Sequence, residues 1–212
     1  WILRRDLALE SRAGEDLTRH LASSADQPQG ALQSGLFRLD RGGSKEAEAW
    51  FRKAIAWDPA SAPFRQALAL AHEAQGNIEA AIGDLEEASK LAPADAEYPF
   101  ALGLAHAAAD QLEEAVKALA IACELDPRFA RAWYNLGLAR SRLKLDLEAI
   151  EAIRRAQAED PEEPEYPFAR ATIHLRRKEV AEARDAALDA LKIDPEYPDA
   201  MGLLEQIELE RE

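Results

Sequence analysis

Residues 130–163 read ARAWYNLGLARSRLKLDLEAIEAIRRAQAEDPEE, and this stretch decides the fold of the chain. Its apolar residues recur every three or four positions on either side of a short turn, which predicts two amphipathic helices. Asp160-Pro161 ends the second helix, because proline cannot continue the helical hydrogen-bond ladder. The stretch therefore predicts one pair of helices joined by a tight turn.

The same pair recurs along most of the chain. Five prolines are each separated by 34 residues: Pro59, Pro93, Pro127, Pro161 and Pro195. They define five units, 28–61, 62–95, 96–129, 130–163 and 164–197. Small residues form three columns at the same period: Gly35, Ala69, Gly103, Gly137, Ala171; Ala47, Ala81, Ala115, Ala149, Ala183; and Ala54, Ala88, Ala122, Ala156, Ala190. Helices approach closely only where side chains are short, so we predict that these columns mark helix crossings.

The composition predicts an all-α protein. Helix-forming residues dominate, and β-branched residues are scarce and never alternate over the length of a strand. The formal net charge of −14 argues against nonspecific binding to nucleic acid or to an anionic membrane. No run approaches the ~20 apolar residues that membrane insertion needs. The single cysteine, Cys123, excludes an internal disulfide and leaves the cellular compartment open.

The repeat resembles the tetratricopeptide repeat in its residues as well as in its period. Residues 130–163 carry these residues at the family's positions: Trp133, Leu136, Gly137, Ala149, Ile153, Ala156 and Pro161. The resemblance covers about residues 28–197 and a following helix. It implies a right-handed α-solenoid, in which the first helix of each unit lines a concave face.

The two ends of the chain differ from the units. We expect residues 1–27 to form an N-terminal helical segment, either a degenerate repeat or the remnant of an upstream domain. Because the chain begins at Trp1 rather than Met, we expect a fragment or a processed product. Residues 198–212 are expected to form a capping helix, with Met201, Leu204 and Ile207 on its packed face.

Two units depart from the pattern of the others. Pro99 and Pro167 stand where the family has its first Trp, which predicts that these helices begin at the prolines. Arg170 stands where the repeat has Leu, which predicts looser packing in the fifth unit.

No motif for catalysis is present. The sequence lacks a Gly-rich phosphate loop, HExxH, CxxC and a nucleophile elbow, so we predict no enzyme activity, no cofactor and no metal site. His72, His106 and His174 share one position of the unit, which suggests a metal ladder or a pH sensor. Their helices are expected to lie about 8–10 Å apart, too far to share an ion easily, so we favour packing residues with polar tips. We interpret Cys123 likewise as a packing residue.

The family resemblance also places a partner-binding face. The fifth and ninth residues of the third to fifth units form an apolar and aromatic stripe on the expected concave face, broken only by Thr172 at its end: Phe100, Leu104, Tyr134, Leu138, Phe168 and Thr172. Asn135, at the sixth place of its unit, is expected to hydrogen-bond a peptide backbone.

Basic residues concentrate beside this stripe. Between Arg128 and Leu145 there are five bases and no acid, although the whole chain is acidic. We predict that Arg131, Arg142 and Arg176 attract an acidic segment of a partner protein, while the aromatic residues bury its apolar anchors.

The leading hypothesis is a non-enzymatic scaffold that binds a peptide or a helix of a partner in this groove. One alternative is self-association into a homo-oligomer, through the groove or through an uncovered end. Another is the non-catalytic C-terminal tail of a larger enzyme, since residues 97–115 resemble the repeat tails of bacterial multiheme cytochrome-like proteins. No CxxCH heme site is present in the chain itself.

Overall fold

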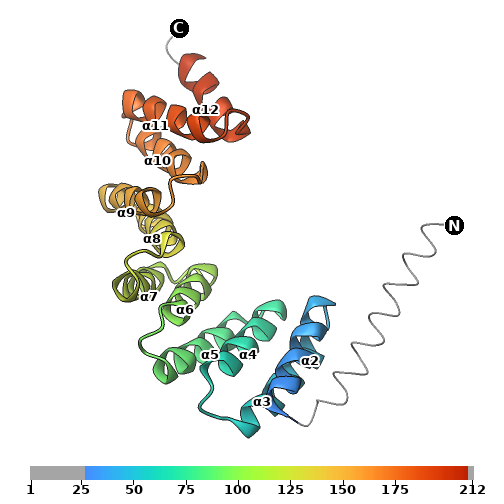
Figure 1. The fold of residues 1–212 in the computed structure, drawn as a ribbon. Helices are drawn as coiled ribbons and strands as arrows, with labels where there is room; N and C mark the ends of the chain where they lie inside the picture. Colours follow the sequence, from blue (N-terminus) through green and yellow to red (C-terminus); the bar gives the residue numbers. More distant parts are fainter. Residues whose placement is uncertain (1–26, 210–212) are drawn as a thin grey trace, which may run out of the picture. The chain divides into compact units, whose positions relative to one another are not determined.

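The computed structural model describes residues 27–209, which contain eleven α-helices and no β-strand (Figure 1). The helices are α2 (Pro28–Asp40), α3 (Ser44–Trp57), α4 (Ala62–Ala74), α5 (Ile78–Leu91), α6 (Glu97–Ala108), α7 (Leu112–Leu125), α8 (Ala130–Arg142), α9 (Asp146–Glu159), α10 (Glu165–Arg176), α11 (Val180–Ile193) and α12 (Pro198–Leu209). The all-α prediction is confirmed. The N-terminal segment predicted before Gln27 lies outside the described residues.

The chain divides after Pro93 into two compact units. From here on, the first and the second unit mean these two compact units and not the 34-residue repeats. The first contains the helix pairs α2–α3 and α4–α5. The second contains α6–α7, α8–α9 and α10–α11, followed by α12. Within each unit, the second helix of one pair packs on the first helix of the next. Each is therefore a stack of helix pairs, as the solenoid prediction requires. The division into five repeats at the boundaries given above stays a prediction.

Every first helix of a pair ends in the same backbone conformation. The second residue after each helix has a positive φ: Gly42 (78°), Gly76 (75°), Asp110 (60°), Lys144 (63°) and Lys178 (64°). The next N–H then bonds back into the last helical turn, as from Leu145 to the carbonyl of Arg140 at 3.0 Å. This left-handed residue produces the tight turn that the sequence predicted.

The columns of small residues mark helix crossings, as predicted. A Cβ added to Gly35, Gly103 or Gly137 would lie 2.3–2.5 Å from a side chain of the paired helix. The facing side chains are Phe51, Leu119 and Ile153, and all three are fully buried. The ten alanines of the other two columns are 0% exposed. Any larger side chain at these positions would force the helices apart.

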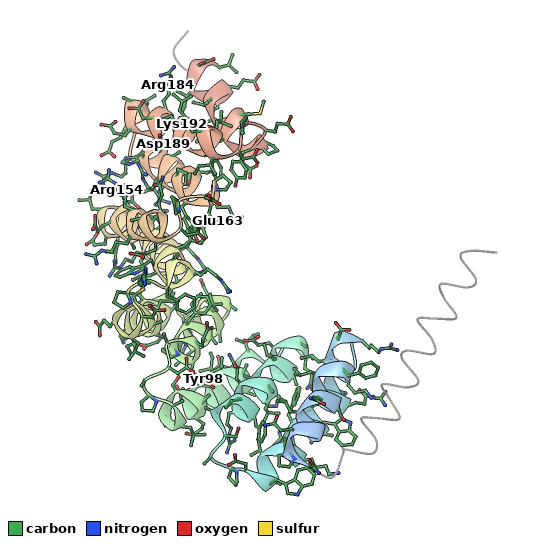
Figure 2. The ribbon with its side chains drawn as sticks, viewed as in Figure 1. Tyr98, Arg154, Glu163, Arg184, Asp189 and Lys192 are labelled. Carbon is green, nitrogen blue, oxygen red and sulfur yellow. The ribbon has the colours of Figure 1, made fainter. Side chains whose placement is uncertain are left out.

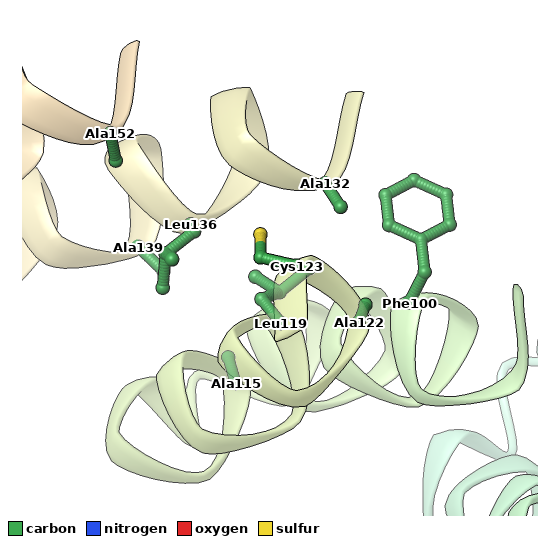
Figure 3. Close-up of a cluster of buried hydrophobic side chains, with 9 residues drawn as sticks. All are labelled: Phe100, Ala115, Leu119, Ala122, Cys123, Ala132, Leu136, Ala139 and Ala152. Carbon is green, nitrogen blue, oxygen red and sulfur yellow. The ribbon is translucent and has the colours of Figure 1, made fainter. Parts of the chain in front are cut away.

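The core of the second unit lies in the layers between successive helix pairs. One cluster joins α6, α7, α8 and α9 through Phe100, Ala115, Leu119, Ala122, Cys123, Ala132, Leu136, Ala139 and Ala152 (Figure 3). Cys123 is 2% exposed, and burial raises the pKa of its thiol to about 12. A neutral, buried thiol is a packing group, which agrees with the interpretation from sequence.

Arg170 interrupts the next layer of this core. It occupies the position of Leu136 in the preceding pair, and its Nη1 donates to Gln157 Oε1 at 2.6 Å. Its Nε is buried without a hydrogen-bond partner. Burial, and then the charge of Arg154, lower the pKa of Arg170. A guanidinium thus replaces apolar packing between α9 and α10.

Two details of the helix ends differ from the predictions. Helices α6 and α10 begin at Glu97 and Glu165, two residues before Pro99 and Pro167, because the first-turn N–H groups have no helical acceptor and proline is tolerated there. In α12 the packed face consists of Ala200, Leu203, Leu204 and Ile207. Met201 lies beside that face and is 52% exposed, so its assignment to the packed face was wrong.

Within residues 27–209, no helix combines the length and the hydropathy that a bilayer crossing requires.

Candidate partner-binding surface

The residues predicted to bind a partner all belong to the first helices of pairs in the second unit. Phe100 and Leu104 lie on α6, and Phe168 and Arg176 lie on α10. The other five lie on α8: Arg131, Tyr134, Asn135, Leu138 and Arg142. Because α8 contacts both α6 and α10, these residues come from three neighbouring helices.

The aromatic residues of the stripe form pairs with rings that the sequence analysis missed. The ring centroids of Phe100 and Phe129 lie 4.7 Å apart, and those of Tyr134 and Tyr166 lie 4.9 Å apart. Phe168 meets Tyr197 edge-on at 5.6 Å. Phe129 and Tyr197 each end a 34-residue unit, but they lie two periods apart with Glu163 between them, so only a search at 68 residues would have linked them.

The stripe is not uniformly accessible. Phe100 is 4% exposed and belongs to the core cluster of Figure 3, so it packs beneath the surface and is not accessible to a partner. Leu104, Tyr134, Leu138 and Phe168 are half-buried and present part of each side chain to solvent. The accessible apolar surface is therefore centred on α8 and α10.

Tyr134 is the most central of these residues and remains a neutral phenol. Burial raises its pKa to about 12, and the nearby Glu165 carboxylate contributes in the same direction. The hydroxyl group therefore keeps its proton at neutral pH and can donate a hydrogen bond to a partner.

Of the three predicted arginines, Arg131 points outward without an ion pair in the described part of the chain. Its guanidinium carbon lies 5.2 Å from the centroid of the Phe100 ring, a cation–π contact that orients the side chain over the core. Arg131 is exposed and carries the free positive charge of this face.

Arg142 and Arg176 instead fasten neighbouring repeats. Arg142 donates to the Ala107 carbonyl at 3.1 Å and to Asp110 Oδ1 at 2.6 Å. Arg176 donates to Ser141 Oγ at 2.8 Å and bonds the carboxylate of Asp146. The two arginines occupy one repeat position, and each reaches the end of the preceding first helix. We call these contacts the arginine bridges.

Asn135 is partly engaged by its own helix. Its amide nitrogen donates to the Arg131 carbonyl at 2.8 Å, which uses one of its two N–H groups. The second N–H and the carbonyl oxygen of this amide are the groups left for the peptide contact that the sequence suggested.

The three repeat-related histidines are buried and act as polar tips between helices. Nδ1 of His72 lies 2.8 Å from Asp84 Oδ2, that of His106 lies 2.7 Å from Gln111 Oε1, and that of His174 lies 2.8 Å from Glu179 Oε2. No group of three or more metal-ligating side chains that could hold an ion occurs among residues 27–209.

A surface depression of about 500 Å³ lies on α11, away from the stripe. It is lined by Asp185, Leu188, Asp189, Leu191 and Lys192. Figure 2 labels Asp189 and Lys192, which bond each other at 2.8 Å. Because all five residues belong to one helix, no groups from other helices converge there as a binding site requires.

Comparison with known families identifies the repeat. A family described as tetratricopeptide repeat matches residues 62–95 and 130–163, and a second family of that description matches 147–198. A family described as TPR repeat matches 107–144. Together these matches span more than half of the 212 residues. No curated protein matches the sequence.

Several solved structures share the fold. A crystal structure of MamA is 23% identical with a TM-score of 0.71, and the match covers 76% of this chain and 95% of that one. MamA 41-end from Desulfovibrio magneticus RS-1 is 21% identical with a TM-score of 0.73, over 82% and 98% of the two chains. YrrB, described as a TPR protein with an unusual peptide-binding site, is 16% identical with a TM-score of 0.69, over 88% and 96%. At these identities the likeness shows the fold alone. None of these proteins is a multiheme cytochrome, so that resemblance gains no support here.

Proposed function

Because the chain belongs to the tetratricopeptide repeat proteins, we propose that it is a non-enzymatic scaffold that binds a peptide or a helix of a partner protein on α6, α8 and α10. Tetratricopeptide repeats are typically non-catalytic interaction modules. The observation that carries the proposal is the run of half-buried apolar and aromatic side chains on these neighbouring helices. The inner side of each residue is fixed by packing and the outer side faces solvent. These side chains therefore lose little entropy when a partner covers them.

Tyr134 is the proposed centre of the contact. It lies on the middle helix, its ring is held against Tyr166 at 4.9 Å, and its phenol keeps a proton to donate. Leu138 lies one helical turn further along the same face, where an apolar anchor of the partner would also contact it. Phe168 on α10 extends the surface to the next repeat.

The charge of the proposed partner depends mainly on Arg131. We propose that its guanidinium pairs with an acidic residue of the partner, next to the apolar anchors. Arg142 and Arg176 already hold Asp110 and Asp146, so a carboxylate of the partner would have to share or displace these ion pairs. Their contribution to affinity is therefore expected to be smaller than that of Arg131.

YrrB, a TPR protein with an unusual peptide-binding site, supports this proposal by likeness of fold.

Selection from a displayed peptide library, with the purified chain as bait, tests the proposed function. Enriched peptides should combine an aromatic or aliphatic anchor with an acidic residue, and Tyr134→Ala should weaken their binding at least about tenfold. Arg131→Ala should weaken acidic peptides more than neutral ones. Ile121→Ala, on the exposed face of α7, serves as the matched control. Equal binding by Tyr134→Ala and the unaltered chain would overturn the assignment of the surface.

A further inference from the structure

The two most exposed large apolar side chains of residues 27–209 lie in surroundings of opposite charge. Leu209, at the end of α12, is 67% exposed, and Leu147, in the first turn of α9, is 64% exposed. Each has a second exposed apolar residue close to it in sequence, Met201 (52%) and Leu145 (42%). Clustered apolar exposure of this kind marks contact sites, whereas single exposed leucines need no explanation.

The first surface is the outer face of α12, formed by Met201, Glu205, Glu208 and Leu209. Their spacing of three and four residues places them on one side of the helix, opposite the buried Ala200 and Ile207. Helix α12 contains three acids and no base. This outer face is therefore apolar and acidic.

The second surface is the turn edge of the second unit, formed by Lys144, Leu145 and Leu147 with Lys178 one repeat further. All four are exposed, and neither lysine makes an ion pair within residues 27–209. Around them, residues 142–148 and 176–179 together with Asp110 contain five bases and four acids, and Arg142, Arg176 and Arg177 are paired with Asp110, Asp146 and Glu179, which leaves Lys144 and Lys178 as the unpaired bases. The edge is therefore apolar and basic, within a chain of net charge −14.

We propose that a second copy of this chain docks the outer face of its α12 on the turn edge, so that copies associate head to tail. Leu147 and Leu145 would be covered by Leu209 and Met201, while Lys144 and Lys178 meet Glu205 and Glu208. Two copies of the same surface repel each other by charge, so a symmetric contact between like surfaces is disfavoured. Where each pair of copies uses the contact once, one surface of each kind stays free and the contact builds chains or rings, whereas reciprocal use closes a two-fold dimer.

Sedimentation of the full chain tests the contact. The mass should rise above that of the 23.4 kDa monomer with increasing concentration, and it should fall when salt is raised from ~0.05 M to ~0.5 M. Leu147→Glu and Leu209→Lys should each weaken association by about tenfold or more, because each removes a leucine that the contact would cover and adds a charge of the same sign as the facing surface. Ile121→Glu, an equally drastic change in the exposed apolar pair Ile121 (49%) and Leu125 (40%) of α7, should leave association unchanged, because this pair lies outside the two charged surfaces.

Charge exchange makes the test specific to these two surfaces. Lys144→Glu/Lys178→Glu should not associate with itself, and neither should Glu205→Lys/Glu208→Lys. An equimolar mixture of the two variants should associate, because each then offers a surface complementary to the other. A chain that stays monomeric at every concentration, equal effects of Leu147→Glu and Ile121→Glu, or a mixture that stays monomeric would each overturn the proposal. Peptide capture at Tyr134 is measured separately and does not depend on this outcome.

Discussion

The two compact units join their helix pairs by different polar contacts. In the first unit, His72 of α4 lies between Asp84 of α5 (2.8 Å) and Glu48 of α3 (3.7 Å), and Gln75 donates to Glu48 at 3.0 Å. In the second unit, the arginine bridges connect the ends of α6, α8 and α10 at the exposed turn edge. The position of Arg142 is Ala74 in the first unit, so no bridge can form there.

This difference predicts different sensitivities. The contact in the first unit responds to pH through its two carboxylates, because burial raises the pKa of Asp84 and the hydrogen bond from Gln75 lowers the pKa of Glu48. A contact through exposed guanidinium groups responds to salt, because dissolved ions screen charges at the surface. The same helical period is thus compatible with two distinct ways of joining pairs.

The largest expected effect is a loss of stability that is confined to the second unit. In Gly137→Leu, the new Cβ would lie 2.5 Å from Ile153 Cγ1 and 3.0 Å from the backbone oxygen of Ala149. We expect a loss of about 3 kcal/mol or more in the stability of the second unit, because a backbone atom cannot move aside. Hydrogen exchange should increase across 94–209 while amides of 62–91 stay protected. Gly83→Ala, with open space around its Cβ, is the control and should be neutral or stabilising. Equal deprotection of both units would show that they unfold as one.

The next largest effect is an increase in the stability of the second unit. Arg170 occupies the place that Leu68, 3% exposed, holds in the first unit. Arg170→Leu together with Gln157→Leu removes a half-buried charge and a buried unpaired N–H, and it restores apolar packing between α9 and α10. We expect the second unit to gain about 2 kcal/mol, measured by urea denaturation. A loss of stability would mean that this polar pair fits its site better than leucines do.

Removing one arginine bridge should lower the stability of the second unit, by a smaller amount than either of these two changes alters it. Arg176→Met keeps the length of the side chain but loses the contacts with Ser141 and Asp146. Since Arg176 is about one-third exposed, we expect a loss of about 1 kcal/mol, and less for Arg142→Met at its more exposed bridge. The loss should shrink in ~0.5 M salt. His72→Phe in the first unit should show no such dependence on salt, and an identical dependence would remove the distinction between the units.

Acid should have opposite effects on the stability contributed by one carboxylate of each unit. Hydrogen bonds from Arg177 and then His174 lower the pKa of Glu179 to about 2, so its contribution is present above pH 4.5 and is lost as the pH falls toward 2. Burial raises the pKa of Asp84 in the first unit, so its contribution is present below pH 3.8 and is lost as the pH rises through the folded pKa. The hydrogen bond from Gln75 is the main cause that lowers the pKa of Glu48. Protonation of Glu48 in acid therefore offsets part of the stability that Asp84 contributes at low pH.

Thermal unfolding of Glu179→Gln between pH 2 and pH 6 measures this effect. The variant should lose less stability than the unaltered chain between pH 4.5 and pH 2, because its amide does not titrate. The variant Asp84→Asn, compared over the same range, reports on the first unit. A pH profile of Glu179→Gln that coincides with that of the unaltered chain would contradict the role given to this carboxylate.

The fold was predictable because its decisive residues are spaced by the repeat itself. Gly137, Ala149 and Ala156 recur every 34 residues, and a short side chain has one structural meaning wherever two helices cross. The predicted fold class followed from such positions together with the family resemblance. The crossings at Gly35, Gly103 and Gly137 lie where the columns placed them.

The candidate binding surface was less predictable, because the ion-pair partner of a charged side chain depends on which neighbouring turn the side chain reaches. Arg142 reaches Asp110, which shares the repeat position and the positive φ of Gly42 and Gly76, but the position of the arginine alone does not identify this partner. Arg131 has the same charge and lies at the opposite end of α8, where it makes a cation–π contact with Phe100 and no ion pair within residues 27–209. An arginine on a helix can therefore be assigned to a face from sequence, but not to a partner.

The ten fully buried alanines of the crossings have a consequence for how such a protein changes over time. Because every repeat offers its neighbours the same short side chains at the same positions, a whole repeat can be duplicated or lost while the new junction still fits. Residues such as Tyr134 and Arg131 lie at other positions and are free to diverge in each copy. Chain length and recognition can thus evolve separately, the first by copying and the second by point mutation.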